Sequence, residues 1–225
     1  MVSGTHDQHG DVRRLVLDAA ISIIESDGAE SLSMREVARR AGVSHQAPYH
    51  YFGDRGGIFA AISEEGFASL AKAFREVDFS NTSPAKAGFI AYLGFARNHV
   101  GHFRVMFRND ICGLATHEAA ALTAEDAFNE LLLMVSRTIG VSASEAEQLT
   151  FAIMLWSQAH GLATLILDGP LMNRLPVGGD AESQIQAVIE LASHMVSLQA
   201  MEMGLVPRVT KSRPKLSGFI NSALS

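Results

Sequence analysis

The chain has 225 residues, of which 48% are hydrophobic and 19% charged, and its formal net charge is −6. This length and apolar content allow one or two domains with a buried core, and the net charge excludes a uniformly basic nucleic-acid binder. Cys112 is the only cysteine, which excludes an intrachain disulfide and fits a reducing cytoplasm, with an inert thiol favoured over a redox sensor. The first residues lack the pattern of a signal peptide, and purely apolar runs such as 131–135 are too short to span a membrane. We therefore expect a cytoplasmic protein.

The first regular element predicted is a helix over about 11–27, which ends before Gly28. We expect its apolar stripe to pack behind the next two helices and set their angle. The polar residues 1–10 are expected to form a disordered arm. The apolar stripe consists of Val12, Val16, Ala19, Ala20, Ile23 and Ile24.

Residues 33–59 contain two short helix patterns that meet at a tight turn. Ser33 and Glu36 have the spacing of a capping box, in which each side chain accepts from the other residue's backbone N–H. Gly42 follows the first helix, where a left-handed residue is expected, and Ser44 can cap a second helix over about 45–51. A helix, a short turn with glycine and a second helix form the helix-turn-helix motif.

The second of these helices has polar and aromatic side chains and almost no aliphatic ones. This composition suits contact with base edges and phosphates in a major groove, and the alternative is a polar surface helix. Pro48 removes one backbone N–H from its first turn, and Gly56 and Gly57 predict a looser start for the following helix.

The run Val37-Ala38-Arg39-Arg40-Ala41-Gly42-Val43-Ser44, followed by Tyr49-His50-Tyr51-Phe52 and Arg55, resembles the DNA-binding domain of TetR-family transcriptional repressors. The resemblance covers Val12 to Ile62. It implies an all-α protein of about nine helices, with an N-terminal three-helix helix-turn-helix domain and a larger helical domain for ligand binding and dimerisation. We place these domains at 11–60 and 61–204, with a basic flexible tail at 205–225.

The resemblance also implies a homodimer that represses transcription from a palindromic operator in double-stranded DNA and is released by a small apolar ligand. A helical dimer that regulates transcription without an inducer is the alternative. Residues 33–60 hold four arginines and two acidic residues, so a segment of charge +2 stands on a remainder of −8. Such a local basic face is what phosphate contact requires. The DNA-binding candidates are Ser33, Arg35, Ser44, His45, Gln46, Tyr49, His50, Tyr51 and Arg55.

Five longer helices are predicted beyond the motif, over about 55–76, 84–99, 117–139, 143–168 and 181–203. Asp54 is expected to cap the first of them, where Arg55 and free N–H groups would clamp a phosphate. Ser83 and Pro84 mark the start of the second. A break at Gly101 with a short helix after it, and a loop over 109–116, are expected between the second and third.

The helices over about 143–168 and 181–203 carry more apolar surface than one face can bury. Paired with a second copy of the chain, they would form a four-helix bundle across a two-fold axis. Trp156, His160 and Gly161 match a Trp-x-x-x-His-Gly pattern of one TetR subgroup.

An apolar cavity inside residues 84–168 is the expected ligand site, with His102 or His160 as its polar anchor. Ordinary core packing is the alternative for each residue taken singly. The ligand-binding candidates are His102, Phe103, Met106, Phe107, Phe128, Met134, Phe151, Met154, Trp156 and His160. Nine histidines invite an enzymatic interpretation, but the sequence has no H-E-x-x-H, C-x-x-C, G-x-S-x-G or phosphate-loop pattern. We expect no catalytic residues, no metal site and no cofactor.

Overall fold

The structure, a computed structural model, describes residues 5–80, 82–113, 116–140, 143–169 and 181–205. These residues form ten α-helices, one short 3-10 helix and no strand, which confirms the all-α prediction. The helices are α1 (Thr5–Asp27), η1 (Ala29–Ser31), α2 (Met34–Ala41), α3 (Ala47–Phe52), α4 (Arg55–Arg75), α5 (Pro84–Asn98), α6 (Val100–Met106), α7 (Asn109–Cys112), α8 (Glu118–Ile139), α9 (Glu145–Leu167) and α10 (Ala181–Glu202).

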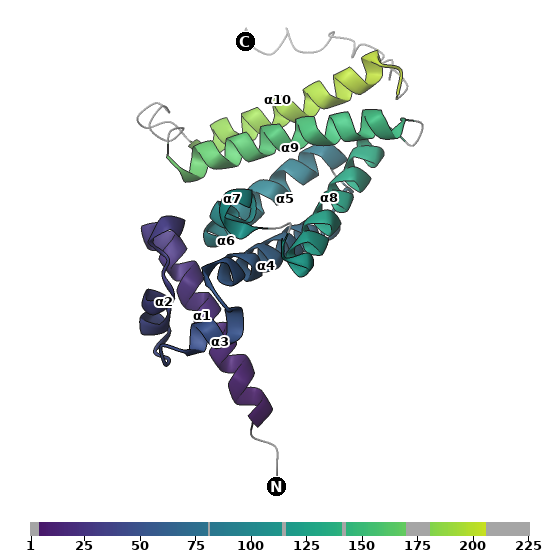
Figure 1. Ribbon diagram of the computed structural model, residues 1–225. Helices are drawn as coiled ribbons and strands as arrows, with labels where there is room; N and C mark the ends of the chain where they lie inside the picture. The colour runs from purple at the N-terminus through teal and green to yellow at the C-terminus, as the bar shows by residue number, and fades with distance from the viewer. Residues whose placement is uncertain (1–4, 81, 114–115, 141–142, 170–180, 206–225) are drawn as a thin grey trace, which may run out of the picture.

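The molecule is elongated, with a small head at one end and a larger body (Figure 1). Helices α1 to α3 form the head, and α4 leads from the head into the body. Helices α9 and α10 lie side by side along the edge of the body farthest from the head. The predicted DNA-binding surface and the helices predicted to form the dimer are therefore at opposite ends.

Four local predictions were wrong. Helix α1 begins at Thr5, so much of the expected disordered arm is helical. Helix α3 begins at Ala47 with Gln46 as its N-cap, so Ser44 lies in the preceding turn and does not cap it. The chain breaks at His99 and not at Gly101, because His99 has non-helical backbone angles. Residues 109–112, which were expected in a loop, form α7.

Two hydrophobic cores hold the fold. The head core is built mainly from α1 and the start of α4, and it includes Val105 and Cys112 from the body. The body core begins at Phe67 of α4 and extends through α5, α6, α8, α9 and α10. Because α4 contributes to both cores, the head cannot move without carrying α4 with it. Cys112 is fully buried.

Helix α9 is long and apolar enough to cross a membrane by length and composition alone. One third of its most apolar window is buried against other helices, and core helices of soluble proteins pass the same test. Ser144 and Glu147 form a complete capping box at its start. The basic tail predicted at 205–225 lies outside the described residues apart from Leu205.

Candidate nucleic-acid interface and body cavity

The helix-turn-helix in the head is defined by the caps of α2 and the turn after it. The Ser33 hydroxyl accepts from the Glu36 N–H at 3.3 Å, and Gly42 has a φ of 67°. The Glu36 carboxylate accepts hydrogen bonds from Arg39 and Arg40, which lower its pKa to about 2. The predicted capping box is therefore only half formed, because Glu36 is used to hold arginines.

Helix α3 turns its polar side chains to solvent and its proline inward. Tyr49 is 41% exposed, and His45, Gln46 and His50 are exposed as well, whereas Pro48 is buried. The rings of His45 and Tyr49 lie 5.8 Å apart, so they form one aromatic surface across the first turn. An exposed face of this kind can approach base edges in a groove.

The arginines of the motif are in different situations. Arg39 binds Glu36, and Arg40 binds Glu36 and Asp27. Arg35 is exposed, and no acidic partner is found for it among the described residues. Arg35 is therefore the motif arginine that can neutralise a phosphate without first breaking an ion pair.

Arg55 lies at the start of α4 as predicted, but its side chain turns back into the head. Its Nη2 donates to the Ala29 carbonyl at 2.9 Å and lies 3.6 Å from the Glu30 carboxylate. Its guanidinium also stacks over the Phe59 ring at 5.0 Å. The geometry gives Arg55 a structural role that the sequence did not reveal. Asp54 caps α4 as predicted by accepting from the Gly57 N–H at 2.9 Å.

Gly57 was expected to loosen the start of α4, but its lack of a side chain serves close packing. A Cβ at Gly57 would stand 1.9 Å from the Phe52 carbonyl oxygen, so only glycine allows α3 to end so close to α4.

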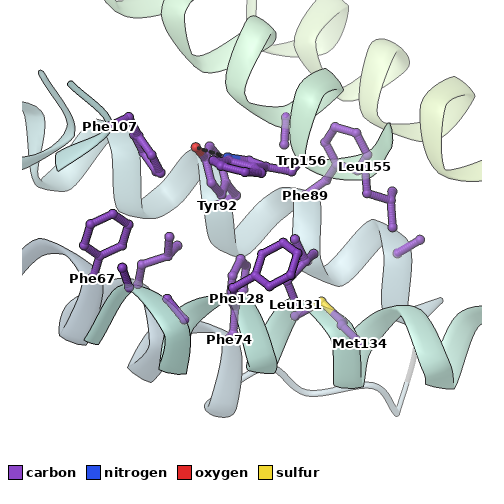
Figure 2. Close-up of a pocket in the computed structure, with 16 residues that line it drawn as sticks. Phe67, Phe74, Phe89, Tyr92, Phe107, Phe128, Leu131, Met134, Leu155 and Trp156 are labelled. Carbon is purple, nitrogen blue, oxygen red and sulfur yellow. Dashed lines mark hydrogen bonds between the residues drawn. The ribbon is translucent and has the colours of Figure 1, made fainter. Parts of the chain in front are cut away.

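The body contains an apolar cavity of about 70 Å³ between α4, α5, α8 and α9 (Figure 2). Aromatic and aliphatic side chains line it, and no lining residue is charged. Four of the ten predicted ligand residues line it, namely Phe107, Phe128, Met134 and Trp156. Phe67, Phe74, Phe89 and Tyr92 also line it and were not among the predicted ligand residues.

A polar cluster of three side chains lies at the cavity wall under α9. The Tyr92 hydroxyl is 2.8 Å from Nδ1 of His160, and the Trp156 indole N–H donates to the Tyr92 oxygen at 3.3 Å. Figure 2 shows Tyr92 and Trp156 meeting across the cavity from Phe128 and Phe74. Burial raises the pKa of Tyr92 and lowers the pKa of His160, so both side chains are neutral near pH 7.

The other predicted ligand residues lie around the cavity or away from it. Phe103 packs on His160 with ring centroids 5.1 Å apart, just behind the wall. Phe151 and Met154 line a separate depression between α9 and α10. Met106 is buried beneath Gly66 of α4, and His102 faces Glu65 with its Nε2 3.6 Å from the carboxylate. His102 is therefore part of the junction between head and body and not an anchor in the cavity.

The head presents an exposed polar helix-turn-helix, and the helical body contains an apolar cavity. This is the architecture of a helix-turn-helix transcription regulator. A family model described as "Bacterial regulatory proteins, tetR family" matches residues 16–62, and one described as "Tetracyclin repressor-like, C-terminal domain" matches 86–192. Together they cover more than half of the chain. The protein belongs to the TetR family of DNA-binding transcriptional regulators, which are not enzymes.

Individual relatives agree with this assignment. The chain is 24% identical over 187 residues to the HTH-type transcriptional activator FasR of Mycolicibacterium smegmatis, covering 80% of each protein. A solved structure of a protein of unknown function from Rhodococcus sp. RHA1 matches with a TM-score of 0.66 and 26% identity, over 88% of this chain and 98% of that one. The TetR-family regulator PfmR of Thermus thermophilus matches in fold with a TM-score of 0.61 and 17% identity, over 80% of this chain and 97% of that one.

Proposed function

We propose that the protein is a homodimeric repressor that binds a near-palindromic operator and leaves it when a small apolar molecule fills the body cavity. The observation that carries the proposal is the exposed polar face of α3 within a helix-turn-helix. Arg35, which is exposed, adds a positive charge to this surface. The proposed domains are a DNA-binding head at 11–60 and a body at 61–204.

The DNA contacts follow from which side chains are exposed. Tyr49, His45, Gln46 and His50 would meet base edges in the major groove, since they form the outer face of α3. Arg35 would neutralise a phosphate at the start of α2, where free N–H groups add to its charge. Ser33, Ser44 and Tyr51 remain candidate phosphate contacts, whereas Arg55 is expected to stabilise the head and not to contact a phosphate.

The dimer would form through α9 and α10. Exposed apolar residues recur along both helices, including Leu149, Ile153 and Leu165 on α9 and Leu191 and Met195 on α10. On α10 the exposed apolar residues Val188, Leu191, Met195 and Leu198 are spaced by three, four and three residues, which is the spacing of a helix-packing seam. A second copy packed on this face would bury it and place two heads on one side of the DNA.

Helix α6 would carry the ligand signal to the head. One side of it presents Phe103 to His160 beside the cavity. On the other side, Arg104 donates to the backbone carbonyls of Ile24 and Glu25 at the end of α1, and the Glu25 carboxylate accepts from the Gly101 N–H. A ligand that displaces α6 therefore moves α1 and changes the distance between the two heads.

The small volume of the cavity favours a second candidate, a dimer that regulates transcription without an inducer. About 70 Å³ holds roughly two water molecules, whereas ligand sites are commonly several hundred Å³. Under the first candidate function, a ligand must therefore push side chains outward to enlarge the cavity. This displacement is what would move α6.

Repression is proposed because a dimer on an operator that overlaps a promoter excludes the polymerase. The relative FasR is named an activator, so a reporter assay should place the selected operator either over or upstream of the promoter. Repression at the overlapping position supports the proposal, and activation at both positions contradicts it.

The test of DNA binding compares two arginines on the selected operator. Operator fragments are first selected from random duplexes, and binding is then measured by fluorescence anisotropy across a salt series. Arg35→Ala should weaken binding and reduce the salt slope by about one unit per subunit, because one phosphate contact is lost. Arg55→Ala is the matched control and should lower thermal stability more than it changes the slope. An unchanged slope for Arg35→Ala together with an unchanged affinity for Tyr49→Ala would contradict the proposed face.

A further inference from the structure

The polar cluster at the cavity wall restricts the chemistry of the molecule that the cavity can accept. The Tyr92 hydroxyl has one proton and two lone pairs, and it lies within hydrogen-bonding distance of His160 and Trp156. We assign the proton of the neutral His160 ring to Nε2, so that the Tyr92 hydroxyl donates to Nδ1. The Tyr92 oxygen then accepts from the Trp156 N–H over a long 3.3 Å contact and has a further lone pair available. The cluster therefore offers a ligand one weakly held donor, the indole N–H, and one acceptor, the tyrosine oxygen.

The cavity around this cluster offers no compensation for a charge. None of the lining residues is ionisable except Tyr92, and the rest present carbon atoms, a thioether and the Trp156 indole N–H. His160 packs against the rings of Phe103 and Phe107, at centroid distances of 5.1 and 4.9 Å. Burial keeps its imidazole neutral. A carboxylate in this place would lose its hydration without gaining a cation, which is costly in an apolar environment.

A hydroxyl group fits the same place. It can accept from the Trp156 N–H and donate to the free lone pair of Tyr92, which leaves the bond between Tyr92 and His160 intact. A carboxylate can only accept, so it would take the tyrosine proton away from His160. We propose that the body site binds an uncharged apolar molecule that bears one hydroxyl group, seated at Tyr92 and Trp156 with its apolar part toward Phe74 and Met134. This inference rests on the proposed function in taking the cavity as a ligand site.

The way in is through the half-exposed side chains of Trp156 and Phe128, whose rings lie 6.3 Å apart across α8 and α9. Their outward rotation enlarges the cavity without disturbing the deeper wall at Leu70 and Phe89, both of which are buried. Trp156 is also the only tryptophan in the chain, so its fluorescence reports occupancy of this site alone.

The experiment titrates the full-length protein with 1-decanol and with decanoate at pH 8, where decanoate is ionised, and follows the Trp156 emission. Decanol should give a saturable change and bind at least tenfold more tightly than decanoate. Equal or tighter binding of decanoate would overturn the inference. It would also be overturned if neither compound gave a saturable change up to its solubility limit.

Two variants separate the hydroxyl contact from general apolar binding. Tyr92→Phe keeps the ring and should reduce the preference for decanol over decanoate by roughly tenfold, because the partner oxygen is removed. Phe128→Leu, on the opposite wall, should weaken both compounds alike and leave their ratio unchanged. An unchanged ratio in Tyr92→Phe would show that Tyr92 does not recognise the hydroxyl.

A separate measurement distinguishes this inference from the proposed function. Operator occupancy is measured with decanol present at saturation. If decanol fills the site with the expected preference and the protein stays on its operator, the inferred ligand chemistry stands and the proposed release mechanism fails.

Discussion

At the scale of single residues, the arginines of the helix-turn-helix have different roles because their surroundings differ. Arg39 and Arg40 share the Glu36 carboxylate, and Arg55 supports the Ala29 carbonyl inside the head. Only a part of the positive charge of the motif is therefore ready to meet DNA. The affinity of one head must be modest, which makes the second head of a dimer part of the DNA-binding mechanism.

His160 predicts a pH dependence of stability. Its pKa in the folded protein lies below the ordinary value of 6.5, since burial disfavours the charged imidazole. Below pH 6.5 the unfolded chain binds a proton that the folded chain rejects, so this contribution to stability is complete above pH 6.5 and is lost as pH falls toward the folded pKa. Denaturant unfolding at pH 7.5 and 5.5 should show the loss. His160→Asn should show a shallower pH dependence, and a slope identical to that of the unaltered protein would contradict the assignment.

The same residue shows what the sequence could and could not predict about the site. Trp156 and His160 were predicted on one helix and, with Phe107, were candidates for one apolar cavity. Tyr92 was missed because it is far from them along the chain, and only the folded structure brings its hydroxyl to His160. The roles of Ser33, Gly42 and Asp54 were predicted correctly because caps and turns are local. The side-chain directions of Arg55 and His102 depend on contacts with distant elements.

At the scale of elements, α6 joins the two halves of the molecule. Its N-terminal turn packs directly on α1, because Gly101 has no side chain to hold the helices apart. A Cβ at Gly101 would lie 2.9 Å from Cγ2 of Ile21 and 3.2 Å from the Ile21 carbonyl oxygen. This close approach lies on the proposed route from the cavity to the head.

Gly101→Ala should therefore uncouple the body from the head. The added methyl group forces α6 away from α1, with an expected loss of stability of about 1–3 kcal/mol. The affinity for the operator in the absence of ligand should change little. The loss of affinity that the ligand causes should be smaller than in the unaltered protein. Gly94→Ala on α5 is the control, since a Cβ there meets no atom within 4 Å. Full release in Gly101→Ala, measured by anisotropy with a saturating ligand, would show that the signal travels by another route.

At the scale of the whole molecule, α9 and α10 lie at the end opposite the head (Figure 1). The exposed apolar residues on these helices are therefore available to a second copy of the chain. The outer side of α9 carries Leu149, Ile153, Ser157, Gly161 and Leu165, which are all exposed and uncharged. Small residues at 157 and 161 form a notch in an otherwise apolar stripe. A notch of this kind allows two helices to approach closely at a crossing point.

Gly161 tests whether this notch is the centre of the dimer. A Cβ at Gly161 meets no atom within 4 Å of the single chain, so Gly161→Ala should stabilise an isolated α9 by about 0.5–1 kcal/mol through helix propensity. In a dimer that crosses at Gly161, the same methyl group forces the helices apart and should weaken self-association roughly tenfold. Sedimentation velocity over a dilution series measures the association, and Gly94→Ala should gain the same helix propensity with no change in dimer affinity. If Gly161→Ala dimerises as tightly as Gly94→Ala, the two chains do not cross at this glycine. If its association falls as expected, operator binding must fall with it, because two modest heads bind DNA tightly only when the body holds them together.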